Sequence, residues 1–249
     1  MTPDSAEQLR GLPGVRIDRA SGTRVNQLFF NFRKPRGHPL DQGKSWRERP
    51  VPGSTGCVHM NVHPLPDTSL LALFRSRWAD AIHASRSHDG GETWSAPEPI
   101  GLPNNNSSVQ YVPLADGWLA LVHNHSSAAD ATARRVSRYD EIDDEGRPDG
   151  TPAPAQPAPA SGRGAFWGAP RAPMTLALSS DGGRTWPERR DLDVGDGHCL
   201  TNNSRDRLNG ELSYPTIQQS PDGALHIAHT YHRQAIKYVR VAPDWARGG

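Results

Sequence analysis

The chain has 249 residues, a formal net charge of +1, 24 Gly, 23 Pro and only 35% hydrophobic residues. So many turn-forming residues favour many short strands over long helices. The near-neutral charge and the scattered basic residues argue against a nucleic-acid surface, and no apolar run approaches the ~18–20 residues that cross a membrane.

The first fifty or so residues are poor in pattern. Leu28–Phe30 form one apolar cluster between basic residues, and Asp41–Trp46 is a worn copy of a motif that recurs later. Met1–Arg19 lack the apolar core of a signal peptide, so we expect a cytoplasmic protein.

One eight-residue pattern, S-x-D-G-G-x-T-W, occurs intact at Ser87–Trp94 and at Ser179–Trp186. Asp-Gly-Gly reaches backbone angles that branched residues avoid, so each copy predicts a tight turn between strands. We expect the Asp to accept hydrogen bonds from backbone N–H groups in the turn, the Thr to begin the next strand, and the Trp to form an apolar plug beneath it.

The segments before the two turns, Ile82–Ser87 and Met174–Ser179, are predicted strands, with Met174, Leu176 and Leu178 on one face. The repeat distance is roughly 40–50 residues once a Pro/Ala-rich insert at about residues 141–170 is set aside, and this period is typical of propeller blades.

We therefore predict an all-β fold with one β-propeller domain over residues 1–249. Its length accommodates about three to three and a half blades. An open ring exposes sheet edges, so the chain is expected to be an incomplete propeller or to associate with a second copy.

Beyond the two turns, Phe74–Asp80, Leu102–Ser108, Val122–Ser126 and Glu211–Ile217 carry a family likeness. From Gly53 to Val241 the chain resembles the sialidase (neuraminidase) superfamily with BNR repeats, in which S-x-D-G-G-x-T-W turns are known as Asp boxes. The resemblance implies a six-bladed propeller and carbohydrate processing. Asp boxes lie away from the active site in this superfamily, so they indicate the fold and not the activity.

The resemblance also implies site residues. Sialidases use a Tyr nucleophile paired with a Glu, an Asp acid and an arginine cluster for the substrate carboxylate. Tyr214 is similarly placed before an Asp-Gly step, with Glu211 as its carboxylate partner and Asp80 as the acid. The chain has no clear equivalent of the early Arg-Ile-Pro motif of the family.

Five further residues are candidates for substrate binding. Arg75 and Arg77 are two apart, so they share a face if both lie on a strand, and the planar guanidinium binds a carboxylate through two hydrogen bonds. Arg233 flanks the last predicted strand pair, Asn105 lies in a polar turn-like stretch, and His125 ends an apolar strand. For each of these residues a solvated surface role is the alternative.

Metal ligation is not expected. Cys57 and His59 have the spacing of two ligands, but no paired C-x-x-C or H-x-x-x-H pattern accompanies them. We expect Cys57 and Cys199 to be buried thiols, and we expect no cofactor.

Three functions remain open. The first is a sialidase-like glycoside hydrolase acting on an acidic or polar glycan. The second is a propeller polysaccharide lyase acting on uronic-acid glycans, with His125 or Tyr214 abstracting a proton. The third is a non-catalytic carbohydrate-binding or truncated propeller. All three predict a glycan or small sugar as the partner, and neither a nucleic acid nor a membrane.

Overall fold

The protein is built almost entirely of antiparallel sheets. The structure, a computed structural model, describes residues 15–16, 27–30, 47–131, 164–198 and 209–247. Within these ranges the helices are a short 3-10 turn, η2 (Ala128–Asp130), and a four-residue helix, α3 (Pro243–Ala246). The described ranges contain no helix long and apolar enough to cross a membrane. The all-β prediction is confirmed.

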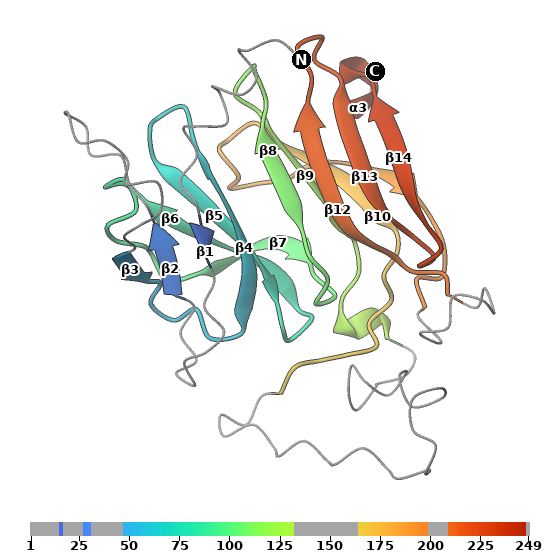
Figure 1. The fold of residues 1–249 in the computed structure, drawn as a ribbon, viewed down its shortest axis with the longest axis horizontal. Coiled ribbons are helices and arrows are strands. Elements are labelled where there is room, and N and C mark those ends of the chain that lie inside the picture. The colour runs from blue at the N-terminus through green and yellow to red at the C-terminus, as the bar shows by residue number, and fades with distance from the viewer. Residues whose placement is uncertain (1–14, 17–26, 31–46, 132–163, 199–208, 248–249) are drawn as a thin grey trace.

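Four sheets follow one another along the chain, from the blue strands to the red strands in Figure 1. In each sheet consecutive strands pair antiparallel, as in the blades of a propeller. The first and last sheets have three described strands and the middle two have four. The strands are β1 (Val15–Arg16), β2 (Gln27–Phe30), β3 (Arg47–Pro50), β4 (Cys57–Pro64), β5 (Leu70–Ser76), β6 (Ala81–Ser87), β7 (Glu98–Pro103), β8 (Gln110–Pro113), β9 (Leu119–Asn124), β10 (Met174–Ser179), β11 (Glu188–Asp193), β12 (Leu212–Gln219), β13 (Leu225–Tyr231) and β14 (Ala235–Val241).

The first strands of three successive blades lie side by side: β4 lies beside β8, and β8 lies beside β12. A propeller arranges its blades radially, so these three strands line the hub. Each pairs with the next strand of its own blade, which runs back in the opposite direction. The starts of β4, β8 and β12 therefore lie at the same end of the blades as the ends of β5, β9 and β13.

Both Asp-Gly-Gly turns lie at the other end of the blades and close through the same hydrogen bonds. Asp89 accepts the Thr93 N–H at 2.9 Å and the Thr93 hydroxyl at 2.5 Å. Asp181 accepts the Thr185 N–H at 2.9 Å and the Thr185 hydroxyl at 2.6 Å. The predicted bonds from the turn backbone to Asp are confirmed. The prediction that the threonines begin the next strands is wrong, because both lie within the turns that their hydroxyls help to close.

Each turn also holds a buried tryptophan, as predicted. Trp94 is 5% exposed, and its indole N–H donates to the Gly91 carbonyl at 3.1 Å. Trp186 is 4% exposed and packs in a cluster with Leu71 of the preceding blade. Next to it the Arg86 side chain donates to the Gly182 carbonyl at 2.7 Å. The second turn therefore fastens its blade to the blade before it.

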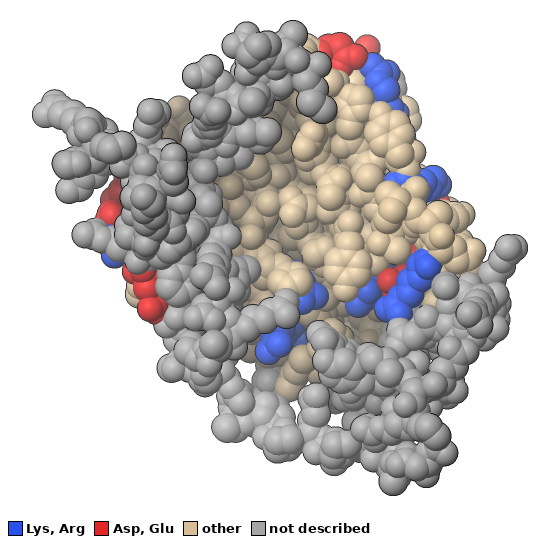
Figure 2. Space-filling model, viewed as in Figure 1, with Lys and Arg blue, Asp and Glu red and all other residues tan. Residues whose placement is uncertain are grey.

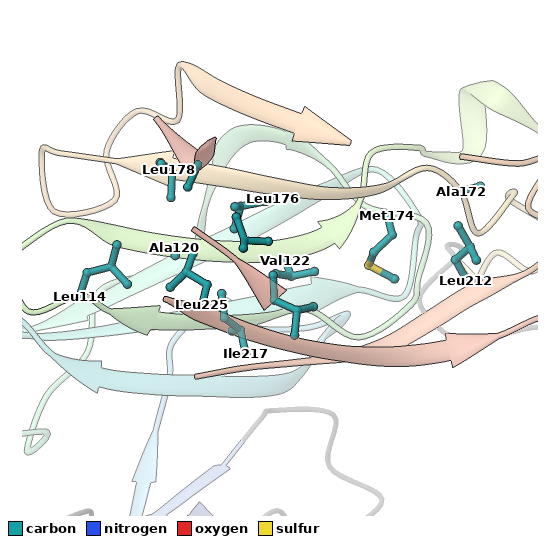
Figure 3. Packing of buried hydrophobic residues seen from close by; sticks show 13 residues of the cluster. Leu114, Ala120, Val122, Ala172, Met174, Leu176, Leu178, Leu212, Ile217 and Leu225 are labelled. Atoms are coloured by element: carbon teal, nitrogen blue, oxygen red, sulfur yellow. The ribbon is translucent and has the colours of Figure 1, made fainter. Parts of the chain in front are cut away.

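The largest apolar cluster joins the second four-stranded blade to the last sheet (Figure 3). Met174, Leu176 and Leu178 of β10 all belong to it, which confirms their predicted common face. Ile217 and Leu225 enter the same cluster from β12 and β13. Every residue of β9 and of β10 is buried, as expected for the interior strands of a blade that is covered on both faces.

Some predictions fall outside the described residues. These are the worn motif copy at Asp41–Trp46, Cys199, and residues 141–163 of the predicted insert. The rest of the insert, residues 164–170, is described and lies against the candidate site.

Candidate active site

Charged and polar side chains gather where β4, β8 and β12 begin and β5, β9 and β13 end. We call this end of the blades the site face. Several predicted site residues belong to the site face. Glu211 and Tyr214 lie just before and on β12, and the others follow the ends of strands: Arg77 and Asp80 after β5, His125 after β9 and Arg233 after β13. In the view of Figure 2, basic side chains cluster around a small acidic area below the middle of the surface, beside a broad uncharged region.

Glu211 stands directly before β12 and holds two arginines. Its side chain is 1% exposed, and one carboxylate oxygen lies 3.3 Å from Arg171 Nη1 and accepts the Ser213 hydroxyl at 2.8 Å. The other oxygen lies 3.1 Å from Arg233 Nε. The arginine side chains are 15% and 28% exposed. One buried negative charge thus fixes two guanidinium groups that still reach the surface, and the cluster keeps a net positive charge.

Tyr214 lies three residues further on and faces solvent. Its residue exposure is 49%, and the Arg171 guanidinium lies 5.6 Å from its ring centroid. Its φ of 51° falls in the left-handed region, within a bulge of β12 between Ser213 and Thr216. A bulky residue with this φ is a backbone outlier, and such strain is common at functional sites. Arg171 therefore touches both the phenol ring and the carboxylate of Glu211.

Arg171 is the last residue of a segment that crosses the site face. We call this segment, residues 166–171, the strap. The Phe166 carbonyl accepts from Asn106 Nδ2 at 3.0 Å, and the Pro170 carbonyl accepts the Ser126 hydroxyl at 2.6 Å. At the last residue of the strap, the Arg171 carbonyl accepts the Leu212 N–H at 2.8 Å. These contacts fix the strap at both ends, and they position Arg171 against β12.

Asn105, a predicted substrate-binding residue, is one of the groups that hold the strap. It is 4% exposed. Its Nδ2 donates to the Pro170 carbonyl at 2.8 Å, and its Oδ1 accepts the Ser107 N–H at 2.9 Å. The polar stretch Asn104–Ser107 is buried and is not an exposed surface loop.

Arg75 lies on β5, inside the site face. Its Nη1 donates to the Asn106 carbonyl, and its Nη2 lies 3.4 Å from Nε2 of His59. Arg77, in contrast, is exposed in the turn after β5. The shared face was expected only if both arginines lay on a strand, and that condition is not met because the strand ends at Ser76.

Asp80 is partly buried in the same turn, where its Oδ1 accepts the Ala81 N–H at 2.7 Å. Burial, together with the charge of Asp80, raises the pKa of the Cys57 thiol to about 12. Cys57 is a buried free thiol, as predicted. Among the described residues, no three His, Cys, Asp or Glu side chains gather in a way that could hold a metal ion.

His125 follows the end of β9, with its ring edge-on to that of His123 at 5.4 Å between centroids. Burial and the neighbouring His125 lower the pKa of His123 to about 3. The pKa of His125 is also lowered, by burial and then by the charge of Arg189. The lowered pKa favours the neutral form of His125 and also makes its ring a weaker base.

Comparison with known proteins supports the architecture. A family model described as the BNR repeat-like domain matches residues 31–227, well over half of the chain. The chain belongs to the BNR repeat-like domain family. No curated protein matches the chain.

Solved sialidase structures share the fold of this BNR repeat-like chain. The leech intramolecular trans-sialidase, complexed with 2,7-anhydro-Neu5Ac, is 14% identical with a TM-score of 0.55 over 90% of this chain. The intramolecular trans-sialidase from Ruminococcus gnavus, in complex with oseltamivir carboxylate, is 14% identical with a TM-score of 0.54 over 89%. The Hadza microbial sialidase Hz136 is 16% identical with a TM-score of 0.52 over 88%. The BNR repeat-like chain spans 28%, 38% and 35% of these three proteins.

The structure adds two residues that the sequence did not single out for catalysis. Arg171 lies just past the predicted insert, where no repeat or strand pattern marks it. His59 stood out in the sequence only as a candidate metal ligand. In the BNR repeat-like fold both contact predicted site residues, Arg171 through Glu211 and His59 through Arg75.

Proposed function

We propose that this chain carries a glycan-processing site that hydrolyses the glycosidic bond of an acidic sugar, as sialidases do. The observation that carries the proposal is the Arg171–Glu211–Arg233 cluster beside the exposed phenol of Tyr214. Similarity to sialidase structures supports the proposal through the fold, and one of those structures holds a ligand named as a carboxylate.

The two arginines supply the recognition chemistry. Each guanidinium has five N–H donors in a fixed plane, and Glu211 lies against Nη1 of Arg171 and Nε of Arg233. The planar guanidinium also matches the two oxygens of a sugar carboxylate. The buried Glu211 carboxylate holds the two side chains in place before substrate arrives, which lowers the entropy cost of binding.

Tyr214 is the proposed nucleophile. A neutral phenol avoids the repulsion that a carboxylate nucleophile would meet at an anomeric carbon bearing a carboxylate. The Arg171 guanidinium over the ring stabilises negative charge on the phenolate oxygen. We assign uptake of the phenolic proton to Glu211, the carboxylate that stands three residues before Tyr214 at the start of β12 and binds the same arginine.

The test is a turnover assay with a fluorogenic sialoside and a panel of acidic oligosaccharides. Tyr214→Phe removes the hydroxyl and keeps the ring contact with Arg171. Tyr238→Phe is the matched control, because Tyr238 is 59% exposed on β14, away from the cluster. We expect Tyr214→Phe to lose at least ~10³-fold in kcat and the control to lose nothing.

Equal rates for the wild type and Tyr214→Phe would remove Tyr214 from the mechanism. Products that absorb in the near ultraviolet, as unsaturated uronates do, would replace hydrolysis with elimination. A folded chain that binds acidic sugars but releases no product would favour a binding module.

A further inference from the structure

Two blades share an unusual backbone feature at the same place. In β4 the pairing with β5 shifts between Val58 and Asn61, and in β12 the pairing with β13 shifts between Ser213 and Thr216. Each bulge opens with a residue in the left-handed region, His59 with φ 52° and Tyr214 with φ 51°. His59 is therefore the register counterpart of Tyr214 on another hub strand.

A left-handed backbone costs a side chain other than glycine roughly 1–2 kcal/mol. Glycine would remove this cost, yet the two blades carry His and Tyr, which are residues with proton-transfer chemistry. Both stand on strands that line the hub, at the site face. An outlier at matching positions of two hub strands points to a functional demand on each side chain.

Each of the two residues also has a guanidinium beside it. Arg171 lies 5.6 Å from the Tyr214 ring centroid, and Arg75 Nη2 lies 3.4 Å from His59 Nε2. Asn106 links the two places: its carbonyl accepts from Arg75 and its Nδ2 donates to the strap at Phe166. The strap ends at Arg171, so one run of contacts positions both guanidinium groups.

We infer that His59 is the proton-transferring residue of the site, acting together with Tyr214. The inference rests on the proposed hydrolase function. In the first step the substrate carboxylate draws the Arg75 guanidinium away from Nε2 of His59 and offsets its charge. His59, protonated at that nitrogen, then gives its N–H proton to the glycosidic oxygen. The bond from that oxygen to the anomeric carbon breaks with its electron pair staying on oxygen. Tyr214 forms a bond to the carbon, and its phenolic proton passes to Glu211.

In the second step neutral His59 takes a proton from water. The water oxygen bonds to the anomeric carbon, the bond to Tyr214 breaks, and the phenolate recovers its proton from Glu211. His59 ends protonated, so the cycle closes with no other reactant than water.

His59 replaces Asp80 in this role because of where each side chain lies. Asp80 is in the turn between β5 and β6, where its Oδ1 accepts the N–H of the next residue. Its charge acts on the buried Cys57 thiol. His59 stands on the innermost strand of the same blade, beside a guanidinium that belongs to the site face.

The test compares leaving groups. His59→Asn is the variant of choice, because Asn tolerates the left-handed backbone and cannot donate an imidazolium proton. His88→Asn, in an exposed position within the first Asp-Gly-Gly turn, is the matched control. Each variant is assayed on a methylumbelliferyl sialoside, whose leaving group departs without a proton, and on sialyllactose, whose leaving group needs one.

We expect His59→Asn to lose at least ~10²-fold in kcat/KM on sialyllactose and less than ~10-fold on the aryl sialoside. Added azide should restore its turnover of the aryl substrate by attacking the tyrosyl intermediate. A loss of the same size on both substrates would mean that His59 only supports the fold. A selective loss in Asp80→Asn instead of His59→Asn would return the role to Asp80. A wild type inactive on both substrates would overturn the proposed function itself.

Discussion

Replacing Glu211 with Gln tests whether one buried carboxylate holds the arginine cluster together. The substitution keeps the shape of the side chain and an oxygen for the Ser213 hydroxyl, but it removes the negative charge. Arg171 and Arg233 then face each other without the group that balances them. Removing one member of a fully buried charge pair costs about 3–5 kcal/mol.

The arginines are not fully buried, and this lowers the expected cost. Their side chains are 15% and 28% exposed, so both can turn partly toward water once the carboxylate is gone. We therefore expect Glu211→Gln to lower the free energy of unfolding by about 2–3 kcal/mol. For a chain of this size, each kcal/mol shifts Tm by roughly 2–4 °C, so Tm should fall by roughly 5–10 °C.

The measurement is urea unfolding together with calorimetry, and Glu92→Gln is the control. Glu92 pairs with Arg49 on the surface, where its side chain is 51% exposed, so its loss should cost less than ~1 kcal/mol. Equal effects of the two substitutions would refute the argument, because they would mean that Glu211 behaves as an ordinary surface charge.

Three other predictions follow from the same geometry. Tyr214→Asn should raise the free energy of unfolding by up to about 1 kcal/mol while abolishing turnover, because Asn relieves the left-handed strain; a less stable variant in urea unfolding would contradict this. Burial raises the pKa of Asp181, but hydrogen bonds from Thr185 outweigh it and lower the pKa to about 2. The charged form of Asp181 thus stabilises the fold above pH ~4, and this contribution is lost toward pH 2. Between these two pH values the free energy of unfolding of the wild type should therefore fall more than that of Asp181→Asn. Gly183→Ala should cost about 1–3 kcal/mol more than Gly182→Ala, since the new Cβ would lie 2.8 Å rather than 3.6 Å from a leucine side chain; equal melting temperatures would show that the blade contact yields freely.

The fold was readable from the sequence because its signals are local. Asp-Gly-Gly followed by Thr and Trp fixes a turn within eight residues, and the hydrogen bonds of Asp89 and Asp181 all stay inside that span. The alternation of Met174, Leu176 and Leu178 identified a strand whose predicted bounds match β10. The error over Thr93 arose because its hydroxyl bonds back to Asp89 and so stays in the turn.

The candidate site was only partly readable, because distant segments assemble it. Tyr214 and Glu211 were named from a family resemblance and Arg75 from its spacing with Arg77, and all three lie at the site face. Arg171 reaches Glu211 across 40 residues of chain. Its contact depends on a strap held by Asn105 across 65 residues, which no local pattern reveals.

The left-handed residues were unreadable for a different reason. In a sequence, glycine indicates where such a backbone can occur, as it does in the two Asp-Gly-Gly turns. His59 and Tyr214 adopt it without glycine, so the sequence around them reads as ordinary strand. Register shifts in β4 and β12 expose the bulges only once the strand partners are known.

The recurrent turns and the candidate chemistry occupy opposite ends of the same strands. β6 runs from Ala81, beside the site face, to Ser87, where the first Asp-Gly-Gly turn begins. Seven residues of strand separate the two ends by roughly 20 Å. Substitutions in the turns should therefore act on stability alone, through the blade contacts of Trp94 and Trp186, whereas substitutions at the site face should also act on turnover. Because of this separation, a propeller can keep its turns while the residues of the site face change. The turns therefore indicate the family of this chain, and Arg171, Arg233 and their partners are the residues that bear on its substrate.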